Sequence, residues 1–331
     1  MSDGGTVHME AFAMHIGRSL LIASLAASLT GCIHEHQDDA GDEVARAIPR
    51  ADEVKINLPQ TDTEFQALGQ IADYYRLTRN VTRSLNGGAA WVLIVVHAIV
   101  DNYPATSVDG NVYTWGPWDE GALAPAIYRL VVTANDDGTY DWQLDGQSKT
   151  VAAAPFESVI SGHAVPDGLP DDDVHLGSGD FTIDFDAGER VNPIDNTPDT
   201  GNVLVTYDLL ARVVTMHAEG VDELGNPGTF DYFYDENDDG SGDFQFALEG
   251  DMEKNSSLAE SALIRSRWQP TGAGRSDAMV SGGDLADLEL TATECWDAQF
   301  GRTYYTDSVT WQPTEGDAGS CAYADVALPE S

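Results

Sequence analysis

The chain has 331 residues, of which 56 are acidic and 16 are basic, and its formal net charge is −40 at pH 7. This excess of acids argues against nucleic acid as a partner, because phosphate contacts require Lys and Arg side chains. An anionic membrane surface should also repel the chain as a whole. Because 42% of the residues are hydrophobic, a folded core is expected and global disorder is excluded.

A lipoprotein signal peptide is predicted for residues 1–31. The run from Leu20 to Leu29 is apolar or small apart from two serines. It has the length of the hydrophobic part of a secretory leader and is too short to span a bilayer as a stable helix. Arg18 supplies the positive charge that precedes such a run, and translation starting at Met14 would give a more regular leader.

The leader ends in Leu29-Thr30-Gly31-Cys32, which resembles the lipobox of bacterial lipoproteins. The resemblance implies cleavage before Cys32 and acylation of that cysteine with palmitate-type chains. We therefore expect an N-terminal lipid anchor in the membrane of the cell envelope, specifically the outer membrane, at its periplasmic face or at the cell surface. The alternative is an ordinary secretory leader with an incidental cysteine.

Residues 32–60 are predicted to be an acidic, flexible tether, because they are rich in Asp and Glu and contain Pro49 and Pro59. The triplet His34-Glu35-His36 offers metal-ligating side chains. However, three adjacent residues of an extended chain do not converge on one ion, so a solvated linker is the preferred interpretation. Beyond the tether we expect a single domain, residues 61–331.

A helical hairpin is predicted for residues 61–104. Thr61-Asp62-Thr63-Glu64 has the pattern of a capping box, and apolar residues recur behind it at helical spacing. Asn86-Gly87-Gly88 should end the first helix. The segment 89–100 is apolar on every side except at His97, and Pro104 ends it. A helix is preferred there, with a strand as the alternative because of its β-branched residues, and His97 is expected to be a core histidine with a hydrogen-bonded partner.

Residues 112–310 are predicted to form an antiparallel β-meander, because the apolar period changes to two and no helical pattern intervenes. Asn135-Asp136-Asp137-Gly138 carries the Asp-Gly dipeptide typical of a hairpin turn. The runs expected to be strands are Tyr128–Val132, Tyr140–Leu144, Phe181–Phe185, Val203–Tyr207, Val213–Ala218, Phe230–Tyr234, Phe244–Leu248, Ala262–Trp268, Asp277–Val280, Leu288–Thr293 and Thr303–Thr306.

The expected fold is therefore mainly β with an N-terminal helical hairpin, in the α+β class. The up-and-down meander should form a curved sheet or an open barrel, and its apolar face should pack on the helices. An outer-membrane pore is disfavoured, because rows of acidic side chains facing lipid would be costly.

One acidic loop has the spacing of a calcium site. In the stretch from Asp235 to Asp243, the residues Asp235, Asn237, Asp239 and Asp243 occupy positions 1, 3, 5 and 9 of a calcium-loop pattern. Position 12 is Phe246, so the usual bidentate glutamate is missing, and the flanking runs are typical of strands. The loop is either a weak Ca²⁺ site or an acidic hairpin turn. No other cofactor is expected.

Two cysteines remain once Cys32 is assigned to the lipid anchor. In an exported chain, the remaining pair, Cys295 and Cys321, is expected to form a disulfide that closes the C-terminal region 295–321. Closing a loop of this length stabilises the folded state by roughly 3 kcal/mol in the chain-entropy model.

No nucleophile elbow, zinc-protease motif, phosphate loop or dinucleotide-binding motif occurs in the sequence. Paired carboxylates of a glycosidase remain open, because the acids offer many pairs. Tyr113, Trp115 and Trp118 could stack on sugars, although Trp115-Gly116-Pro117-Trp118 is more typical of a packed corner.

Four stretches of the chain are similar to a group of uncharacterised lipoproteins of myxobacterial type. They are Asn86–Trp91, Thr106–Gly110, Val112–Trp118 and Glu294–Asp297. The resemblance covers most of the chain that follows the leader. It implies a location in the cell envelope, and it implies no activity and no catalytic residues.

We therefore expect a lipid-anchored, non-enzymatic envelope protein that binds an unknown protein partner or an apolar ligand. The alternative is a surface hydrolase that acts on glycans through paired carboxylates. An apolar lumen with few polar groups would favour the first, whereas close carboxylates beside exposed aromatic side chains would favour the second.

Overall fold

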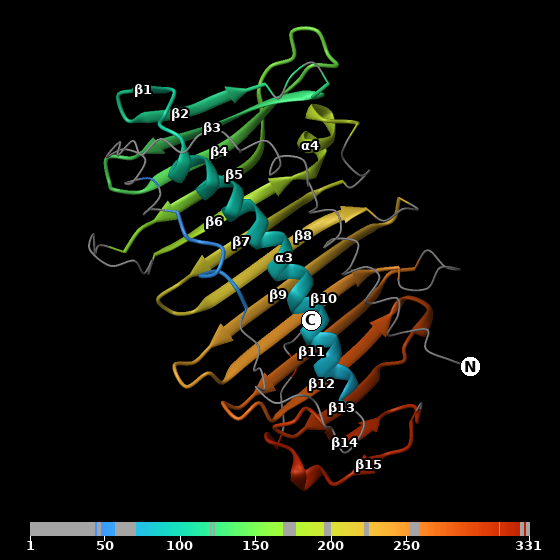
Figure 1. The fold of residues 1–331 in the computed structure, drawn as a ribbon. Coiled ribbons are helices and arrows are strands. Elements are labelled where there is room, and N and C mark those ends of the chain that lie inside the picture. Colours follow the sequence, from blue (N-terminus) through green and yellow to red (C-terminus); the bar gives the residue numbers. More distant parts are fainter. Residues whose placement is uncertain are drawn as a thin grey trace. The chain divides into compact units, whose positions relative to one another are not determined.

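The computed structural model describes residues 44, 48–56, 71–119, 121, 123–167, 177–194, 200–221, 225–251, 258–310, 312–324 and 328. Figure 1 draws the remaining parts of the chain as a thin grey trace. The predicted leader with Cys32, the triplet His34-Glu35-His36 and the capping box Thr61–Glu64 lie outside the described residues. The expectations for these segments therefore stay predictions.

The chain divides into two compact units, although a single domain was expected for residues 61–331. The first unit includes Ile56–Ser84 and Ala211–Ser331, and the second includes Leu85–Leu210 together with the segment that ends at Lys55. The boundary at Ser84 and Leu85 lies inside a helix. Each unit therefore combines one part of that helix with its own set of strands.

The second unit contains seven strands in its described part, and each pairs antiparallel with the next. They are β1 (Ser107–Asp109), β2 (Val112–Trp118), β3 (Ala126–Ala134), β4 (Tyr140–Ser148), β5 (Glu157–Val165), β6 (Ser178–Asp184) and β7 (Asn202–Asp208). A short helix, α4 (Phe185–Val191), follows β6. The predicted hairpin turn is confirmed, because Ala134 pairs with Tyr140 across Asn135–Gly138 and Gly138 has a φ of +84°.

The first unit contains eight strands in its described part, again paired antiparallel in chain order. They are β8 (Val213–Val221), β9 (Pro227–Glu236), β10 (Gly242–Gly250), β11 (Glu260–Trp268), β12 (Gly274–Gly282), β13 (Leu290–Trp296), β14 (Arg302–Asp307) and β15 (Glu315–Gly316). Two short 3₁₀ helices, η1 (Gly283–Leu285) and η2 (Ala318–Ser320), lie between and after them.

The predicted β-meander is confirmed, because the order of the strands is their order in the chain. Among the described residues of either unit, the first and last strands do not pair, so neither set of strands closes on itself. The period of two explains which side chains are buried: Phe244, Phe246 and Leu248 point to one face of β10 and are at most 3% exposed.

The predicted helical hairpin is wrong, because α3 (Asp73–Asn102) is one helix of 30 residues that runs through Asn86-Gly87-Gly88. Two glycines inside a helix cost roughly 2 kcal/mol together relative to alanine. Burial of Val92, Leu93 and Val96, each 0% exposed, offsets that cost several times over. The choice of a helix over a strand for the described backbone of residues 89–100 is confirmed.

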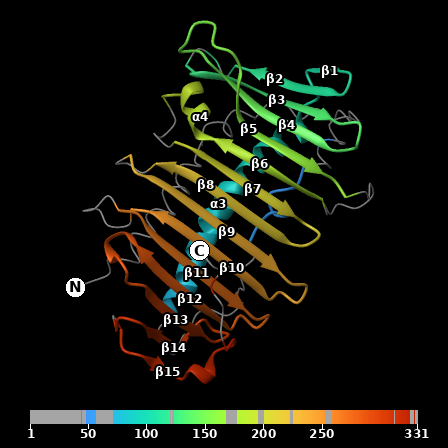
Figure 2. The same cartoon turned by 180° about the vertical axis from the view of Figure 1, so that it is seen from behind.

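In each unit, one face of the strands lies against its own part of α3 (Figure 1), and the view from behind shows the strands in front of the helix (Figure 2). In the first unit, the ring of Tyr75 stacks on Phe300 with centroids 4.1 Å apart, and the hydroxyls of Thr78 and Ser266 are 2.7 Å apart. In the second unit, Val95 and Ile99 are buried, whereas Ile94 is 56% exposed. The segment is therefore not buried on every side.

His97 is a core histidine, as expected. It is 8% exposed, and its Nε2 atom lies 3.0 Å from the carbonyl oxygen of Ile48 and 3.1 Å from that of Pro49. Ile48 and Val54 are themselves buried. Residues 48–56 are therefore packed against the protein, and the predicted tether does not extend through them.

Four cross-strand pairs place an aromatic ring over a glycine on the buried face of a sheet. They are Trp142 over Gly162, Tyr207 over Gly179, Trp268 over Gly242 and Trp296 over Gly274. A Cβ atom added to any of these glycines would overlap the ring. Large rings thus reach the core by lying flat on backbone that carries no side chain, and both units use this device.

Candidate functional site

The outward face of β4, β5 and β6 carries a row of polar side chains. Asp141 lies directly opposite His163, and His163 lies directly opposite Asp180. These residues point outward because the neighbours Trp142 and Phe181 point into the core, where they are at most 2% exposed. The row therefore has a carboxylate on each side of an imidazole.

This row borders a hollow in the surface with a volume of about 310 Å³. The hollow is lined by Val131, Thr133, Asp141, Trp142, Gln143, Ser161, Gly162, His163 and Asp180. Its side chains supply carboxylate, amide, hydroxyl and imidazole groups. Trp142 contributes little ring surface to a ligand, because its side chain lies on the buried face and is 2% exposed.

His163 and Asp141 form a hydrogen-bonded pair, with Nδ1 of His163 2.7 Å from Oδ1 of Asp141. The two side chains are 38% and 59% exposed. The amide of Asn135 donates to the other carboxylate oxygen of Asp141 at 2.9 Å. These contacts hold the pKa of Asp141 below its ordinary value, with the Asn135 hydrogen bond as the larger cause and the His163 hydrogen bond as the next.

Asp180 has no ion-pair partner among the described residues, and Asp141 is neutralised only to the extent that His163 is protonated. The hollow can therefore accept hydrogen bonds and positive charge from a ligand. No group of three or more metal-ligating side chains converges in the described part of the chain. The pair His163–Asp141 also lacks a hydroxyl or thiol within hydrogen-bonding distance among the described residues, as nucleophilic catalysis would require.

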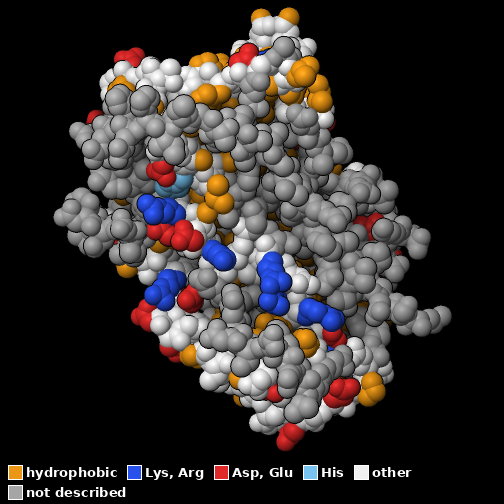
Figure 3. All heavy atoms as spheres, in the orientation of Figure 1, with side chains coloured by type: hydrophobic (Ala, Val, Ile, Leu, Met, Phe, Trp, Pro, Cys, Tyr) orange, Lys and Arg blue, Asp and Glu red, His pale blue; other side chains and the backbone are white. Residues whose placement is uncertain are grey.

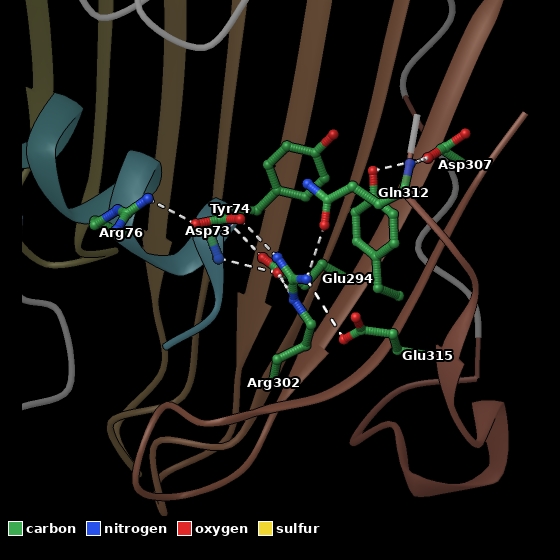
Figure 4. Close-up of polar contacts among 9 residues, drawn as sticks. Asp73, Tyr74, Arg76, Glu294, Arg302, Asp307, Gln312 and Glu315 are labelled. Carbon is green, nitrogen blue, oxygen red and sulfur yellow. Dashed lines mark hydrogen bonds and ion pairs between the residues drawn. The ribbon is translucent and has the colours of Figure 1, made fainter. Parts of the chain in front are cut away.

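A second polar cluster lies where the first turn of α3 meets β13 and β14 (Figure 4). The carboxylate of Glu294 accepts hydrogen bonds from the backbone N–H groups of Asp73 at 3.0 Å and Tyr74 at 2.5 Å. Arg302 donates to Glu294 at 2.6 Å and to Asp73 at 2.6 Å. The cluster thus supplies the capping acceptors that the first turn of a helix needs.

This cluster is closed to solvent, because Glu294 is 0% exposed and the side chain of Arg302 is 3% exposed. Burial raises the pKa of Glu294, while the Tyr74 N–H and Arg302 act in the opposite direction. Gln312 accepts a further hydrogen bond from Arg302 at 3.0 Å. With its hydrogen-bonding groups satisfied internally, the cluster anchors α3 and offers no open position to a ligand.

The proposed calcium loop is a hairpin turn between β9 and β10. Asp239 accepts hydrogen bonds from the backbone N–H and hydroxyl of Ser241, and Asn237 donates to the same hydroxyl. Asp243 is bound by Arg265, with the Nε atom 3.1 and 3.0 Å from its two oxygens. Because Arg265 already pairs with Asp243, one of the four proposed ligands, the alternative of an acidic turn is favoured. Calcium binding stays an untested prediction.

The predicted disulfide is seen. The sulfur atoms of Cys295 and Cys321 are 2.07 Å apart, and the Cα atoms are 5.3 Å apart. The aromatic group in β2 is a packed corner rather than an open platform, because Trp115 is 0% exposed and donates from Nε1 to the carbonyl oxygen of Tyr103 at 2.8 Å. Its neighbour Tyr113 lies with its ring centroid 6.4 Å away.

Sequence analysis missed the residues of both clusters: Asp141, His163, Asp180, Glu294 and Arg302. For the cluster around His163, the sequence contains part of the information, because Asp141 and Asp180 occupy outward positions in strands with alternating apolar residues. The register between strands was needed to bring His163 between them. Glu294 and Arg302 meet Asp73 across more than 200 positions of sequence, and no local pattern indicates such a contact.

Comparison of the chain with protein-family models, characterised proteins and solved structures finds no match. Within the described residues, no helix has the length and apolar character needed to cross a membrane.

Proposed function

We propose that this chain is a lipid-anchored, non-enzymatic protein of the cell envelope that binds a partner through the outward face of β4–β6. The lipobox-like Leu29-Thr30-Gly31-Cys32 supports the anchor. The resemblance of several sequence stretches to myxobacterial-type lipoproteins is consistent with this location. The outer membrane is the membrane that we propose.

The observation that carries the binding site is the row Asp141–His163–Asp180 beside the hollow. Two carboxylates around one imidazole leave this surface with a net negative charge, and arginine is absent from its lining. Such a surface favours a group that donates hydrogen bonds and carries positive charge, such as a lysine or arginine side chain of a protein partner. An apolar ligand is less well supported, because the buried face of these strands is filled by residues such as Trp142, Ile160 and Phe181.

The anchor and the binding site are tested separately. Cys32→Ser in the full chain should move the protein from the membrane fraction to the soluble fraction, and mass spectrometry of the wild-type N-terminus should find acyl chains. Membrane retention of the variant together with an unacylated wild-type N-terminus would refute the anchor.

The binding site is tested with a short Lys/Arg-rich peptide as the probe and calorimetry as the measurement. Asp180→Asn should weaken binding several-fold, because it removes the carboxylate that has no ion-pair partner among the described residues. Asp231→Asn is the matched control: Asp231 also pairs with a histidine, His217, at 2.6 Å, but it lies in the other unit and outside the hollow. Equal loss in the two variants would indicate a general charge effect and would refute the site.

A surface hydrolase is the second candidate, and the flanking of His163 by two carboxylates is the observation that favours it. Adjacent strands are about 4.8 Å apart, so the Cα atoms of Asp141 and Asp180 are about 10 Å apart across β5. Retaining glycosidases need carboxyl groups about 5 Å apart and inverting ones about 6.5–9.5 Å. A Cα separation of about 10 Å is closer to the inverting geometry than to the retaining one. Turnover of a glycan that Asp141→Asn abolishes without unfolding would establish this alternative.

A further inference from the structure

The exposed side of the first three turns of α3 is basic, although the chain as a whole is strongly acidic. Arg76 and Arg83 are exposed and Arg79 is half-buried, whereas Tyr75, Thr78 and Val81 of the same turns are buried. Spacings of three and four residues place the three arginines on one side of the helix, over a length of about 10 Å. We call these three arginines the basic stripe. Figure 3 shows basic side chains over the α3 face of the molecule.

The basic stripe differs from the other arginines of its unit in how it is paired. Arg212, Arg265, Arg267, Arg275 and Arg302 each lie within ion-pair distance of a carboxylate. Arg76 pairs with Asp73 at 2.6 Å. For Arg79 and Arg83, no carboxylate of the described residues lies within that distance. Within the described part of the chain, these two guanidinium groups therefore have no carboxylate that neutralises them.

We propose that the basic stripe docks on the phosphate headgroups of anionic phospholipids in the membrane that holds the anchor. This inference rests on the proposed lipid anchor. A convex helix surface with arginines along one line suits a flat array of phosphates, whereas a single small anion would need a concave site. Guanidinium groups bind phosphate oxygens in pairs of hydrogen bonds, which suits arginine to this role.

The net charge of −40 does not prevent such docking. Electrostatic interactions between exposed charges are largely screened beyond a Debye length, which is about 8 Å at physiological ionic strength. Layers in a protein are packed about 10 Å apart, so the carboxylates on the far side of the sheet, such as Asp231 and Glu249, lie farther than this from a surface that touches α3. A membrane in contact with the stripe therefore lies nearer to the arginines than to these carboxylates, although Asp73, which pairs with Arg76, lies beside the stripe.

The anchor and the basic stripe have different roles at the membrane. Cys32 lies 16 residues before Ile48, where the packed segment 48–56 begins, so acylation keeps the protein at the bilayer without choosing which face meets it. Each arginine near an anionic surface improves binding about fivefold, which is too little for stable attachment without the anchor. The stripe therefore sets the orientation of the first unit, and the acyl chains set its attachment.

The test uses the acylated full chain on vesicles of phosphatidylcholine and on vesicles that contain equal parts of phosphatidylcholine and phosphatidylglycerol. Phenylglyoxal modifies exposed arginines, and mass spectrometry gives the rate at each one. Arg79 and Arg83 should react at least about fivefold more slowly on the anionic vesicles, and 0.5 M salt should remove the difference. Arg212, which is 46% exposed and immediately precedes β8, is the internal control and should react at the same rate on both vesicles.

Arg79→Gln/Arg83→Gln supplies the second measurement. This variant should float with both kinds of vesicle, and its Arg76 should be modified at equal rates on both. Flotation of the wild type with equal rates at Arg79 and Arg83 on the two vesicles would overturn the docking inference and leave the anchor intact. Failure of the wild type to float with either vesicle would overturn the anchor and the inference with it.

Discussion

On the outward face of the first unit, Asp243 is bound by Arg265 of the neighbouring strand, and Asp277 is bound by Arg275 at 2.7 Å. On the outward face of the second unit, Asp141 and Asp180 flank His163, and neither is bound by an arginine. Strand pairing and alternation are the same in both units. The difference lies in which cation stands between the carboxylates.

An arginine is charged at every pH that a protein meets, whereas a histidine is charged only in part near neutral pH. Asp243 and Asp277 of the first surface are therefore neutralised by arginine, and these side chains are committed to one another, whereas Asp231 of the same unit pairs with His217. The second keeps negative charge and hydrogen-bond acceptors open to solvent beside a hollow. The comparison teaches that, in an acidic chain, a candidate binding surface is identified by missing arginines rather than by carboxylates alone.

The largest expected effect comes from breaking the most buried arginine pair of the first unit. Arg302→Met should lower the free energy of unfolding by about 3–5 kcal/mol, because it leaves the carboxylate of Glu294 buried without its countercharge. Arg212→Met is the control. Its pairs with Glu236 and Asp238 are exposed, at 3.8 and 3.5 Å, and removing them should cost less than about 1 kcal/mol. Equal values in urea denaturation would contradict the assigned role of the buried cluster.

Gly→Ala substitutions on the buried faces of the two units should lower the stability by similar amounts, because both faces place a tryptophan over a glycine. Gly162→Ala in the second unit and Gly274→Ala in the first should each cost about 1–3 kcal/mol, since the new methyl group overlaps Trp142 or Trp296. Gly250→Ala is the matched control in β10, where the nearest atom to the added carbon is 3.8 Å away. That variant should be neutral or slightly more stable. Thermal unfolding of the three variants measures the difference.

The same residues show how far the sequence alone could lead. Alternation in runs such as Phe244–Leu248 predicted most strands of the meander, because one face of each is apolar. In the run Phe181–Phe185 the last residue was assigned wrongly, since Phe185 begins α4. β5 was missed because Gly162 and His163 interrupt its alternation. Gly162 belongs in a strand only because Trp142 covers it, and a single sequence does not contain that information. The continuous helix through Asn86-Gly87-Gly88 was missed for a similar reason, since tertiary burial outweighs local propensity.

The candidate site was less predictable than the fold. Outward positions of Asp141 and Asp180 follow from alternation, but the meeting of both with His163 depends on the registers of two hairpins. The anchor of α3 joins Asp73 to Glu294 and Arg302, which are far away in the sequence. The disulfide between Cys295 and Cys321 was predictable because only one pairing remained after Cys32.

A smaller effect is expected when an arginine is placed on the outward face of the second unit, as on the outward face of the first unit. His163→Arg places a permanent cation between Asp141 and Asp180, as Arg265 does beside Asp243. The free energy of unfolding should rise by up to about 1 kcal/mol, because exposed ion pairs contribute little. Binding of the Lys/Arg-rich peptide should nevertheless weaken several-fold, since the arginine pairs with these carboxylates and lowers the net negative charge of the row. A variant that binds the peptide as well as the wild type does would refute the proposal that open negative charge makes this site.

The smallest effect concerns the titration of Asp141. Its pKa lies below the ordinary value, chiefly because the Asn135 amide donates to it and secondarily because His163 does. A carboxyl group with a lowered pKa in the folded state contributes stability above the pKa of the unfolded chain, and this contribution is lost as the pH falls through the folded-state value. Since the side chain is 59% exposed, solvent screens the effect, and the pKa itself is the better observable. In a carbon-13 NMR titration, Asn135→Ala and His163→Gln should each raise the pKa of Asp141 toward its ordinary value. An unchanged pKa in both variants would show that these two contacts do not set the charge on this side of the hollow.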